Sequence, residues 1–378
     1  MKFVLAPDSF KESMTAKEVS ISMENGLKKI FPTAEYIKVP MADGGEGTVQ
    51  ALIDATNGKI FKKEVLGPLG KPITSEFGIL GDGTTAVIEM ASASGLYHIE
   101  SENRNPLITT TFGTGELIKH ALDKNVNKIF IGIGGSATND GGSGMLQALG
   151  GKLLTKSGKD ISFGGGALSD LCKIDLSNLD PRIKNISIDV ACDVNNPLTC
   201  ENGASYIFGP QKGATPNMVT TLDKNLKHYA NIIKRDLQKD IENVPGAGAA
   251  GGLGAGLMAF LSANLKKGVD LVIEYTNLEE KVKNADFVLT GEGAIDYQTR
   301  FGKTPYGVAS IAKKYDIPVI VLVGKIGDGC EVLYAGGITS IFSILAGTMD
   351  IKEALKIGKA NVERTSENIG RLIKSISK

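Results

Sequence analysis

The sequence predicts an α/β protein of two domains, and three observations support this expectation. Short apolar runs that end in Gly, Pro or Asp alternate with helical patterns, as in βαβ units around a parallel sheet. The segment 59–90 instead alternates in polarity and is broken by glycine turns, which is typical of hairpins. The length of 378 residues is that of two or three domains. We therefore expect residues 1–58 and 270–378 to form a Rossmann-like parallel-sheet domain, with residues 59–269 inserted as a second α/β domain that contains the hairpins.

In the Rossmann-like domain, apolar runs predict the strands and capping signals predict the helices. Thr15 and Glu18 have the spacing of a capping box, and Thr304-Pro305 marks a second helix start. A further helix is expected to open near Asp350. The expected strands span residues 3–7, 36–39, 286–290, 318–323 and 340–345.

In the inserted domain, further strands and helices are expected after the hairpins. Thr215-Pro216 supplies an N-cap and a first-turn proline for a long helix. The glycine-rich stretch 245–256 leads into an apolar helix that we expect to run through Leu265. Strands are expected over residues 128–133 and 186–191, and a helix over about 114–123.

Composition and charge exclude several classes of protein. Lys+Arg and Asp+Glu both number 42, so the net charge is zero and neither nucleic acid nor membrane is expected as a partner. No apolar run reaches 18 residues, and the apolar start of the chain is too short for a signal peptide, which predicts a cytoplasmic protein. The four cysteines lack zinc-site spacing and are expected to be buried, reduced thiols. The 47 glycines cluster without a period, which favours an enzyme whose backbone approaches a ligand.

Acidic and basic side chains follow the first two expected strands. Asp8, Ser9 and Lys11 come after the first strand, and Asp43 comes after the second, beside Gly44-Gly45. In open α/β sheets ligands collect outside the carboxyl ends of strands, so these side chains would face a crevice. Lys11 can hold a phosphate or carboxylate, and Asp8 can accept a proton or bind a metal ion. The same residues could instead simply cap turns.

The most informative single segment is IFIGIGGSATNDGGSGM, residues 129–145. An apolar strand runs into Gly134, Gly135 and Ser136, with Asp140 following before the next helix. Consecutive glycine amides ahead of a helix form an anion cradle, although tight packing of a strand on a helix would also use glycine. Neither a Walker A motif nor the G-x-G-x-x-G dinucleotide fingerprint is present.

Three later segments offer further polar groups. Asp193 follows the strand at 186–191, and Gly251-Gly252 could belong either to a second phosphate loop or to a linker. Glu292, Asp296 and Lys303 follow the strand at 286–290, and carboxylates beside cations are what phosphoryl transfer requires. A solvated charged loop is the alternative for this last segment. The three histidines lie in no motif and no G-x-S-x-G segment exists, so a Ser-His-Asp hydrolase is not expected.

The order of these motifs resembles the bacterial glycerate kinase family, type 1. The resemblance covers residues 4 to about 345. The segments that carry it are PDSFKES, MADGGEGT, GTGELI, GIGGSATNDGG, ACDVNNPL, FGPQKGA, PGAGAAGG and LTGEG-x-x-D-x-Q-x-x-x-GK-x-P. Cys200 departs from the family pattern, in which a glycine is expected at this point, and the departure concerns the local turn.

The resemblance implies ATP- and Mg²⁺-dependent phosphorylation of D-glycerate, with the 2-hydroxyl favoured as acceptor and the active site in the cleft between the domains. Within that reaction we hypothesise catalytic roles for Lys11, Glu292, Asp193 and Asp296. Asp193 and Asp296 are the expected Mg²⁺ ligands, and either of them could be the general base. The residues expected to bind ATP are Gly134, Gly135, Ser136, Asp140, Gly251 and Gly252. The residues expected to bind glycerate are Asp8, Ser9, Asp43 and Lys303.

Other functions stay open from the residues alone. A related kinase could form 3-phosphoglycerate, and a sugar-acid sensor would need a pocket without so many carboxylates. A nicotinamide-dependent 2-hydroxy-acid dehydrogenase is disfavoured because the dinucleotide fingerprint is missing. A homo-oligomer is compatible with the sequence.

Overall fold

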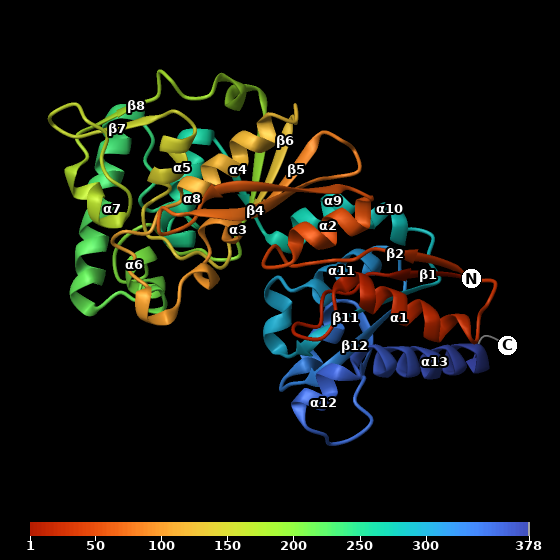
Figure 1. The fold of residues 1–378 in the computed structure, drawn as a ribbon. Helices are drawn as coiled ribbons and strands as arrows, with labels where there is room; N and C mark the ends of the chain where they lie inside the picture. The colour runs from red at the N-terminus through yellow and green to blue at the C-terminus, as the bar shows by residue number, and fades with distance from the viewer. Residues whose placement is uncertain (377–378) are drawn as a thin grey trace. The chain divides into compact units, whose positions relative to one another are not determined.

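The computed structural model describes residues 1–376 and has the predicted α/β fold (Figure 1). The chain divides into two compact units. Unit 1 comprises residues 1–43, 50–57 and the chain from Gly268 onward, and unit 2 comprises residues 44–49 and 58–267. The expected domain boundaries near residues 58 and 270 remain a prediction about independent folding.

Unit 1 is built on a five-stranded, wholly parallel sheet in the order β13-β12-β11-β1-β2. Its strands are β1 (Lys2–Leu5), β2 (Glu35–Lys38), β11 (Phe287–Ile295), β12 (Val319–Ile326) and β13 (Ile338–Ser343). The chain steps from β1 to β2 on one side and later adds β11, β12 and β13 on the other. The strand order therefore reverses between β1 and β11, and such a switch point is where open α/β sheets bind ligands.

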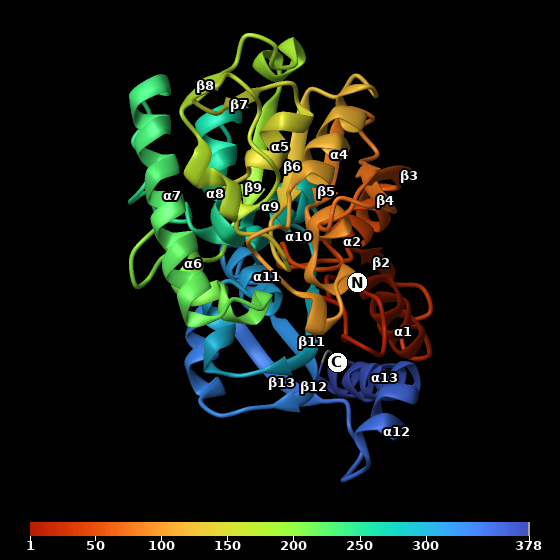
Figure 2. The same ribbon diagram turned by 60° about the vertical axis from the view of Figure 1, so that its left-hand side comes forward.

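The two long helices of unit 1, α1 (Ala16–Lys28) and α13 (Gly358–Ile376), lie side by side against one face of this sheet (Figure 2). Thr15 caps α1 as predicted, because its Oγ1 accepts from the Glu18 N–H at 3.2 Å and Glu18 Oε2 accepts from the Thr15 N–H. Gly26 permits the close approach of α1 to α13, since a Cβ there would lie 2.2 Å from Glu363 O. The helices assigned largely or wholly to this unit are α1 (Ala16–Lys28), α2 (Thr48–Thr56), α9 (Gly268–Thr276), α10 (Leu278–Val282), α11 (Thr304–Lys313), α12 (Ile351–Lys356) and α13 (Gly358–Ile376).

Strand β11 is longer than the sequence analysis predicts. The expected strand stopped at residue 290 and left Glu292 on a loop, which is wrong. Pairing with β12 continues to Ile295, and Glu292 lies opposite Val323. Gly291 makes this possible, because a Cβ there would lie 2.2 Å from Leu322 O. Glu292 is therefore held by a sheet, which fixes its position more firmly than a loop would.

Unit 2 contains a six-stranded mixed sheet in the order β10-β9-β6-β5-β4-β3. The predicted hairpins are confirmed, since β3, β4 and β5 pair antiparallel while β5, β6, β9 and β10 pair parallel. Glu89, Gly132 and Ala191 are aligned at the carboxyl ends of three neighbouring parallel strands. The strands are β3 (Lys59–Leu66), β4 (Pro72–Ile79), β5 (Thr85–Glu89), β6 (Lys128–Gly132), β9 (Ser187–Ala191) and β10 (Asn264–Lys266), with a separate ribbon of β7 (Lys152–Leu154) and β8 (Lys173–Asp175).

The helices of unit 2 agree with the predicted starts but not with every predicted end. Thr215 caps the long helix α7 as expected. The apolar helix α8 ends at Leu261 and not beyond Leu265, because Ser262 adopts a left-handed conformation (φ 53°) and Leu265 belongs to β10. The helices are α3 (Ala91–Ser94), α4 (Phe112–Leu122), α5 (Ser143–Ala148), α6 (Ala204–Phe208), α7 (Pro216–Leu237) and α8 (Ala249–Leu261).

The cysteines correct one expectation and explain another. All four are free thiols, but Cys172 and Cys200 are exposed, so the prediction of four buried thiols is wrong for these two. Cys200 stands in a turn with φ 74°, a conformation that glycine adopts without a steric penalty. The glycine expected at this position therefore has a conformational reason.

Candidate active site

A group of carboxylates lies at the switch point of the unit 1 sheet. Asp8 follows β1, and its N–H donates to Gly291 O at 2.9 Å, which places it beside β11. Glu292 is the next residue of β11, and Asp43 follows β2. Repulsion from Asp43 raises the pKa of both Asp8 and Glu292, so the three carboxylates are close enough to interact. The structure thus brings together three of the predicted residues at the edge where ligands are expected.

Asp8 is held by short hydrogen bonds on both carboxylate oxygens. Thr304 Oγ1 donates to Oδ2 at 2.6 Å, and the Ser9 N–H donates to Oδ1 at 2.6 Å. Burial raises the pKa of Asp8 to about 6, with Asp43 adding to the rise and the bonds from Thr304 and Ser9 opposing it. Near neutral pH Asp8 is therefore ionised yet a better proton acceptor than an ordinary aspartate.

Glu292 has fewer partners than Asp8. Its side chain is 12% exposed, Lys303 Nζ lies 3.8 Å from Oε1, and Thr299 Oγ1 donates a long bond of 3.4 Å. Burial raises the pKa of Glu292 to about 8. The positive charge of Lys303 opposes this rise, and the negative charges of Asp8 and Asp43 add to it. Glu292 thus keeps its proton near neutral pH and can donate a hydrogen bond.

The other predicted residues of unit 1 lie beside the carboxylates, on a 3₁₀ turn or on an exposed turn. Ser9 supports Asp8, and Lys303 caps α11 beside Glu292. Asp296 caps a short 3₁₀ turn, where its Oδ1 accepts from the Gln298 N–H at 2.8 Å. Lys11 is exposed on the turn between β1 and α1.

In unit 2, the loop after β6 presents three consecutive amides. Within the described residues, the N–H groups of Gly134, Gly135 and Ser136 donate no hydrogen bond, and Gly134 and Gly135 are exposed. Gly135 has φ 71°, which turns neighbouring amides toward the same side. We call these three residues the amide nest, and the binding of an anion to it stays a prediction.

Carboxylates lie near this nest. A cavity of about 60 Å³ is lined by Gly134 and Gly135, by Gly44 and Gly45, and by Glu46, Glu89, Ala91, Tyr97 and Gly132. Glu89 accepts from the Val49 N–H at 2.8 Å, and burial raises its pKa, with Glu46 contributing to the rise. The cavity therefore combines exposed amide donors with carboxylate acceptors, a pairing that suits a small ligand carrying both a negative charge and hydroxyl groups.

Asp140 is buried and does not face this cavity. Its carboxylate accepts from the N–H and Oγ1 of Thr111 at 2.8 and 2.9 Å, and from the amides of Gly142 and Gly144 at 3.2 and 3.3 Å. Burial raises the pKa of Asp140, and these four hydrogen bonds oppose the rise. The side chain joins the loop after β6 to the start of α4, which is a supporting role. Its assignment as an ATP contact stays a prediction.

Gly251 and Gly252 approach the protein's own backbone. Both have left-handed φ values, and a Cβ at Gly251 would lie 1.9 Å from Thr138 O. A Cβ at Gly252 would lie 2.9 Å from Gly141 Cα, and the Gly141 N–H donates to Gly251 O. These glycines let α8 pack on the loop after β6. Direct contact with ATP remains a prediction for them.

Asp193 follows β9, whose carboxyl end neighbours that of β6, and it is exposed there. It therefore lies at the same edge of the sheet as the nest. Its expected role as a metal ligand or general base stays a prediction. The described residues contain no preformed cluster of three or more His, Cys, Asp or Glu side chains with metal-binding geometry.

Three side chains at these clusters, Thr304, Glu89 and Lys212, have no role among the sequence-based predictions. Thr304 was treated only as a helix start, although its hydroxyl also holds Asp8. Glu89 ends a hairpin-rich stretch and carries no local motif. Lys212 belongs to the FGPQKGA segment, and its charge gave no sign that it would be 1% exposed. The turn residues that flank Lys212 in the sequence also draw attention to it, but they do not predict its burial.

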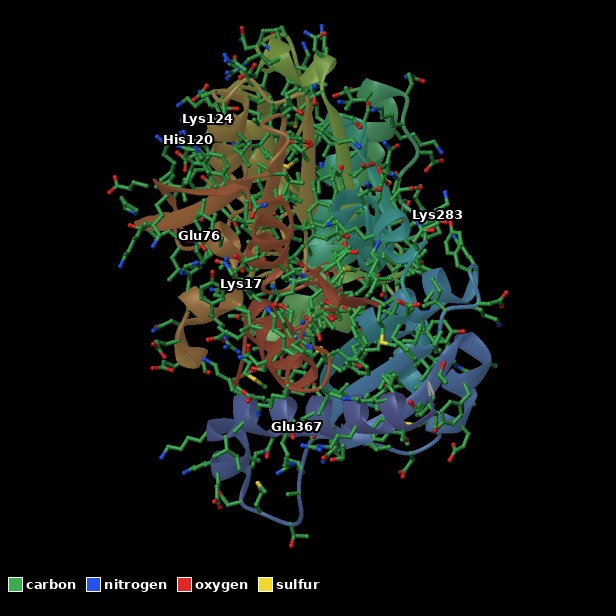
Figure 3. The ribbon with its side chains drawn as sticks, turned by 90° about the vertical axis from the view of Figure 1, so that its right-hand side faces the viewer. Lys17, Glu76, His120, Lys124, Lys283 and Glu367 are labelled. Atoms are coloured by element: carbon green, nitrogen blue, oxygen red, sulfur yellow. The ribbon has the colours of Figure 1, made fainter. Side chains whose placement is uncertain are left out.

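The histidines play structural parts. Nε2 of His98 lies 3.0 Å from Ser92 O, and Nε2 of His228 lies 2.7 Å from Leu171 O. His120 lies on the outer surface near Lys124, at the end of α4 (Figure 3).

Across residues 1–376, no helix combines the length and apolar character needed to span a membrane.

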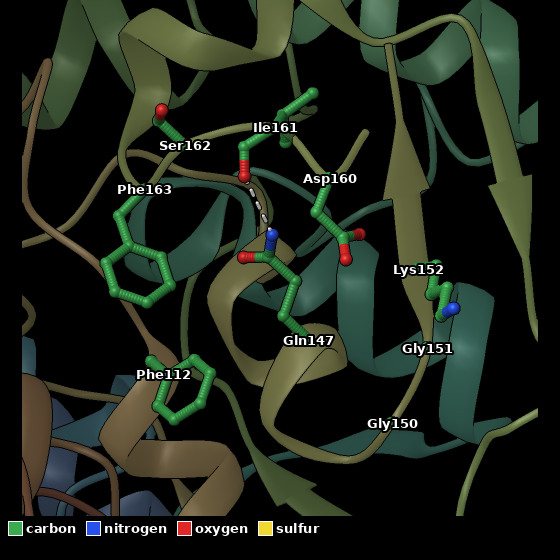
Figure 4. A pocket seen from close by; sticks show the side chains of 9 residues that line it. All are labelled: Phe112, Gln147, Gly150, Gly151, Lys152, Asp160, Ile161, Ser162 and Phe163. Atoms are coloured by element: carbon green, nitrogen blue, oxygen red, sulfur yellow. Dashed lines mark hydrogen bonds between the residues drawn. The ribbon is translucent and has the colours of Figure 1, made fainter. Parts of the chain in front are cut away.

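A larger cavity of about 570 Å³ lies elsewhere in unit 2, near the end of α5 (Figure 4). Gln147 Nε2 donates to Ile161 O at 3.0 Å, and its buried Oε1 has no partner and points to the side where Phe112 and Phe163 lie. None of the predicted site residues lines this cavity. We assign it no part in the reaction.

The fold and the two clusters define an α/β enzyme of the phosphoryl-transfer type, with carboxylates at one sheet edge and an amide nest at another. The sequence profile of the glycerate kinase family matches residues 3–374, and the chain belongs to this family. It is 54% identical to a glycerate kinase of Bacillus subtilis over 99% of this chain and 98% of that protein. It is also 54% identical to the glycerate 2-kinase of Escherichia coli K12, over 98% of this chain and 97% of the relative. A crystal structure of a candidate glycerate kinase 2 from Salmonella typhimurium LT2 matches with a TM-score of 0.93 and 50% identity, covering 99% and 98% of the two chains.

Proposed function

We propose that this protein transfers the terminal phosphoryl group of ATP to the 2-hydroxyl of D-glycerate. Membership of the glycerate kinase family supports the reaction class. The observation that carries the mechanism is the carboxylate group of unit 1, in which burial and mutual repulsion move the pKa of Asp8 to about 6 and that of Glu292 to about 8. Two carboxyl groups with separated pKa values near neutrality suit an acid and a base.

In this proposal Asp8 accepts the proton of the attacking hydroxyl. Thr304 and Ser9 hold its two oxygens, so the carboxylate has a fixed orientation. The protonated Glu292 donates a hydrogen bond to an oxygen of a substrate, and Lys303 beside it attracts negative charge. Kinases act largely by positioning and charge stabilisation, so these few groups can account for much of the chemistry. Lys11, Ser9 and Asp43 are proposed as further contacts of the substrates.

The nest of unit 2 is proposed to bind phosphate oxygens of ATP through the amides of Gly134, Gly135 and Ser136. Within the described residues the three amides have no protein acceptor, and Gly134 and Gly135 are exposed, which supports this assignment because a bound anion would satisfy them. In this proposal the conformation of the loop after β6 is supported by Asp140, Gly251 and Gly252.

Mg²⁺ is proposed to accompany ATP. The donor set fits, because Mg²⁺ prefers oxygen ligands and commonly uses one or two carboxylates together with substrate phosphates. Asp296 keeps Oδ2 for such a role while Oδ1 caps its turn, and Asp193 is exposed at the edge of its sheet. When bound, the ion would neutralise charge on the phosphates.

The product decides between the proposed 2-kinase and a 3-kinase. D-Glycerate, ATP and Mg²⁺ are incubated with the protein, and the products are followed by ADP release and phosphorus NMR. We expect ADP release that depends on D-glycerate, together with the signal of 2-phosphoglycerate. A 3-phosphoglycerate signal would overturn the position, and absence of glycerate-dependent ADP release would overturn the activity. Full turnover by both Asp193→Asn and Asp296→Asn would contradict their placement.

A further inference from the structure

Lys212 is a lysine enclosed by the interior of unit 2, with only 1% of its surface exposed. It lies at the end of a short 3₁₀ turn between α6 and α7. Its Nζ donates to Ser136 Oγ at 2.8 Å and to Thr138 O at 2.7 Å. Both acceptors are neutral, and both belong to the loop after β6 that carries the amide nest. Burial lowers the pKa of Lys212 to about 7, with the charge of Asp140 opposing the fall.

Burying an ammonium group against neutral oxygens is an expensive way to stabilise a fold. The ionised group loses its hydration, and two hydrogen bonds to uncharged acceptors recover only part of that loss. A methionine of similar length would pack there without this cost, so stability alone does not account for the charge. A role of Lys212 in holding the loop after β6 would explain why a charged residue is buried there.

The contacts of Ser136 indicate what that purpose is. Because Ser136 Oγ accepts from Lys212, its own hydroxyl proton must point away from the ammonium group. The neighbouring Ala137 N–H donates to Ser94 O, and the Leu96 N–H donates to Gly135 O, so the loop is anchored on both sides of Ser136. The Ser136 amide itself donates no hydrogen bond within the described residues. Lys212 thus holds the one nest residue that has a side chain.

We propose that Lys212 is a positioning residue for ATP binding, which holds Ser136 and Thr138 so that the amides of the nest converge on a phosphate. This inference rests on the proposed function of the nest. Because Lys212 is enclosed and its Nζ bonds to Ser136 and Thr138, it acts through these two residues and not by contact with the nucleotide. In its protonated form Lys212 adds to the attraction of the site for an anion from a position that water does not screen.

The consequence is a selective loss of nucleotide affinity when Lys212 is changed. Lys212→Met removes both donated bonds and the charge while keeping an unbranched apolar side chain. We expect the Kd for ATP to rise at least about 10-fold, with a smaller change in the KM for D-glycerate, because the effect of the bonds lies on the phosphate-binding loop. Lys124→Met is the matched control, since Lys124 is an exposed lysine of the same unit (Figure 3) and should leave both constants unchanged.

A double-mutant cycle tests whether Lys212 acts through Ser136. ATP binding is measured by calorimetry for the wild type, Lys212→Met, Ser136→Ala and the double variant, with thermal unfolding as the check on folding. If the two residues act together, the loss in the double variant falls short of the product of the single losses by about 5-fold or more. Independent losses, or an unchanged Kd in Lys212→Met, would overturn the proposal.

Two arrangements keep the test decisive. If Lys212→Met does not fold, Ser136→Ala alone carries the test, and the proposal then requires a raised Kd for ATP with thermal stability close to that of the wild type. Binding is measured without D-glycerate, so the result is separate from turnover. A wild-type protein that binds ATP but does not phosphorylate glycerate would overturn the proposed function and leave the role of Lys212 standing.

Discussion

The buried charges of the two units are treated in opposite ways. In unit 2, Asp140 accepts four hydrogen bonds from the chain. In unit 1, Glu292 has one long bond and a lysine at 3.8 Å, and two other carboxylates repel it. Unit 2 surrounds the Asp140 carboxylate with hydrogen-bond donors of its own chain, whereas unit 1 leaves the Glu292 carboxyl group short of partners.

This difference distinguishes buried charges that stabilise the fold from buried charges that can act on a ligand. A charge whose bonds are all made by the protein has little left to offer a ligand, and its removal damages the fold. A carboxyl group with a strongly raised pKa and few partners costs stability, and such groups concentrate at functional sites. The comparison therefore predicts that substitutions of Asp140 and of the unit 1 carboxylates affect activity and stability in opposite proportions.

The largest effect is expected for Asp8→Asn. Loss of the proton acceptor should lower kcat/KM by about 10²–10⁴-fold, the range usual for general acid–base groups. The melting temperature should stay the same or rise, because a repulsive buried charge is removed. Steady-state kinetics with D-glycerate and differential scanning fluorimetry give the two readouts. An active variant, or an inactive one that is also unfolded, would break the comparison.

Asp140→Asn should show the reverse pattern. An amide can accept some of the four bonds, but its NH₂ group would face the donors that now meet a carboxylate. We expect the free energy of unfolding to fall by about 3 kcal/mol, as when one partner of a buried charged interaction is removed. Urea unfolding measures this loss. A variant with normal stability and greatly weakened ATP binding would instead support direct contact of Asp140 with the nucleotide.

Substitution of Gly251 tests whether glycine is needed there for close packing of the chain. Gly251→Ala places a Cβ 1.9 Å from Thr138 O at φ 67°, so a loss of more than about 2 kcal/mol is expected from the clash and the left-handed backbone together. Gly158→Ala is the control, because Gly158 has φ 77° and open space around it, and only the backbone cost of about 1 kcal/mol applies. Equal losses measured by urea unfolding would show that close packing is not the reason for Gly251.

The smallest effect is a change in the pH dependence of stability at Glu292. Its folded-state pKa of about 8 lies above the ordinary value of 4.5, so the folded state binds the proton more tightly and stability falls as the pH rises between those values. Glu292→Gln should flatten this decline, and it should keep activity within about 10-fold because an amide also donates hydrogen bonds. Melting temperatures from pH 5 to 8.5 compare the two proteins. A parallel decline in both would mean that Glu292 is ionised in the fold.

Local patterns in the sequence were sufficient wherever a short stretch decides its own structure. The capping box at Thr15, the first-turn proline after Thr215 and the hairpins at 59–90 are all present, because each depends on neighbours within a few residues or on adjacent strands. The glycines at 134 and 135 likewise indicated a turn that exposes amides. The end of β11 was missed because Gly291 pairs with β12, a strand about 30 residues later in the chain, and no local signal reports such a partner.

By itself, then, the sequence determined the α/β class, the starts of most helices and the segments in which chemistry could lie. Tertiary structure alone decided that Asp8 stands beside Glu292, that Asp140 turns inward to backbone amides and that Lys212 is enclosed behind Ser136. The physical reason is that helix caps and turns depend on bonds between near neighbours in the chain. Burial and the partners of a charge depend on segments far apart in the chain, such as β1 and β11, whose paired residues are 284 positions apart and which only the folded sheet brings together.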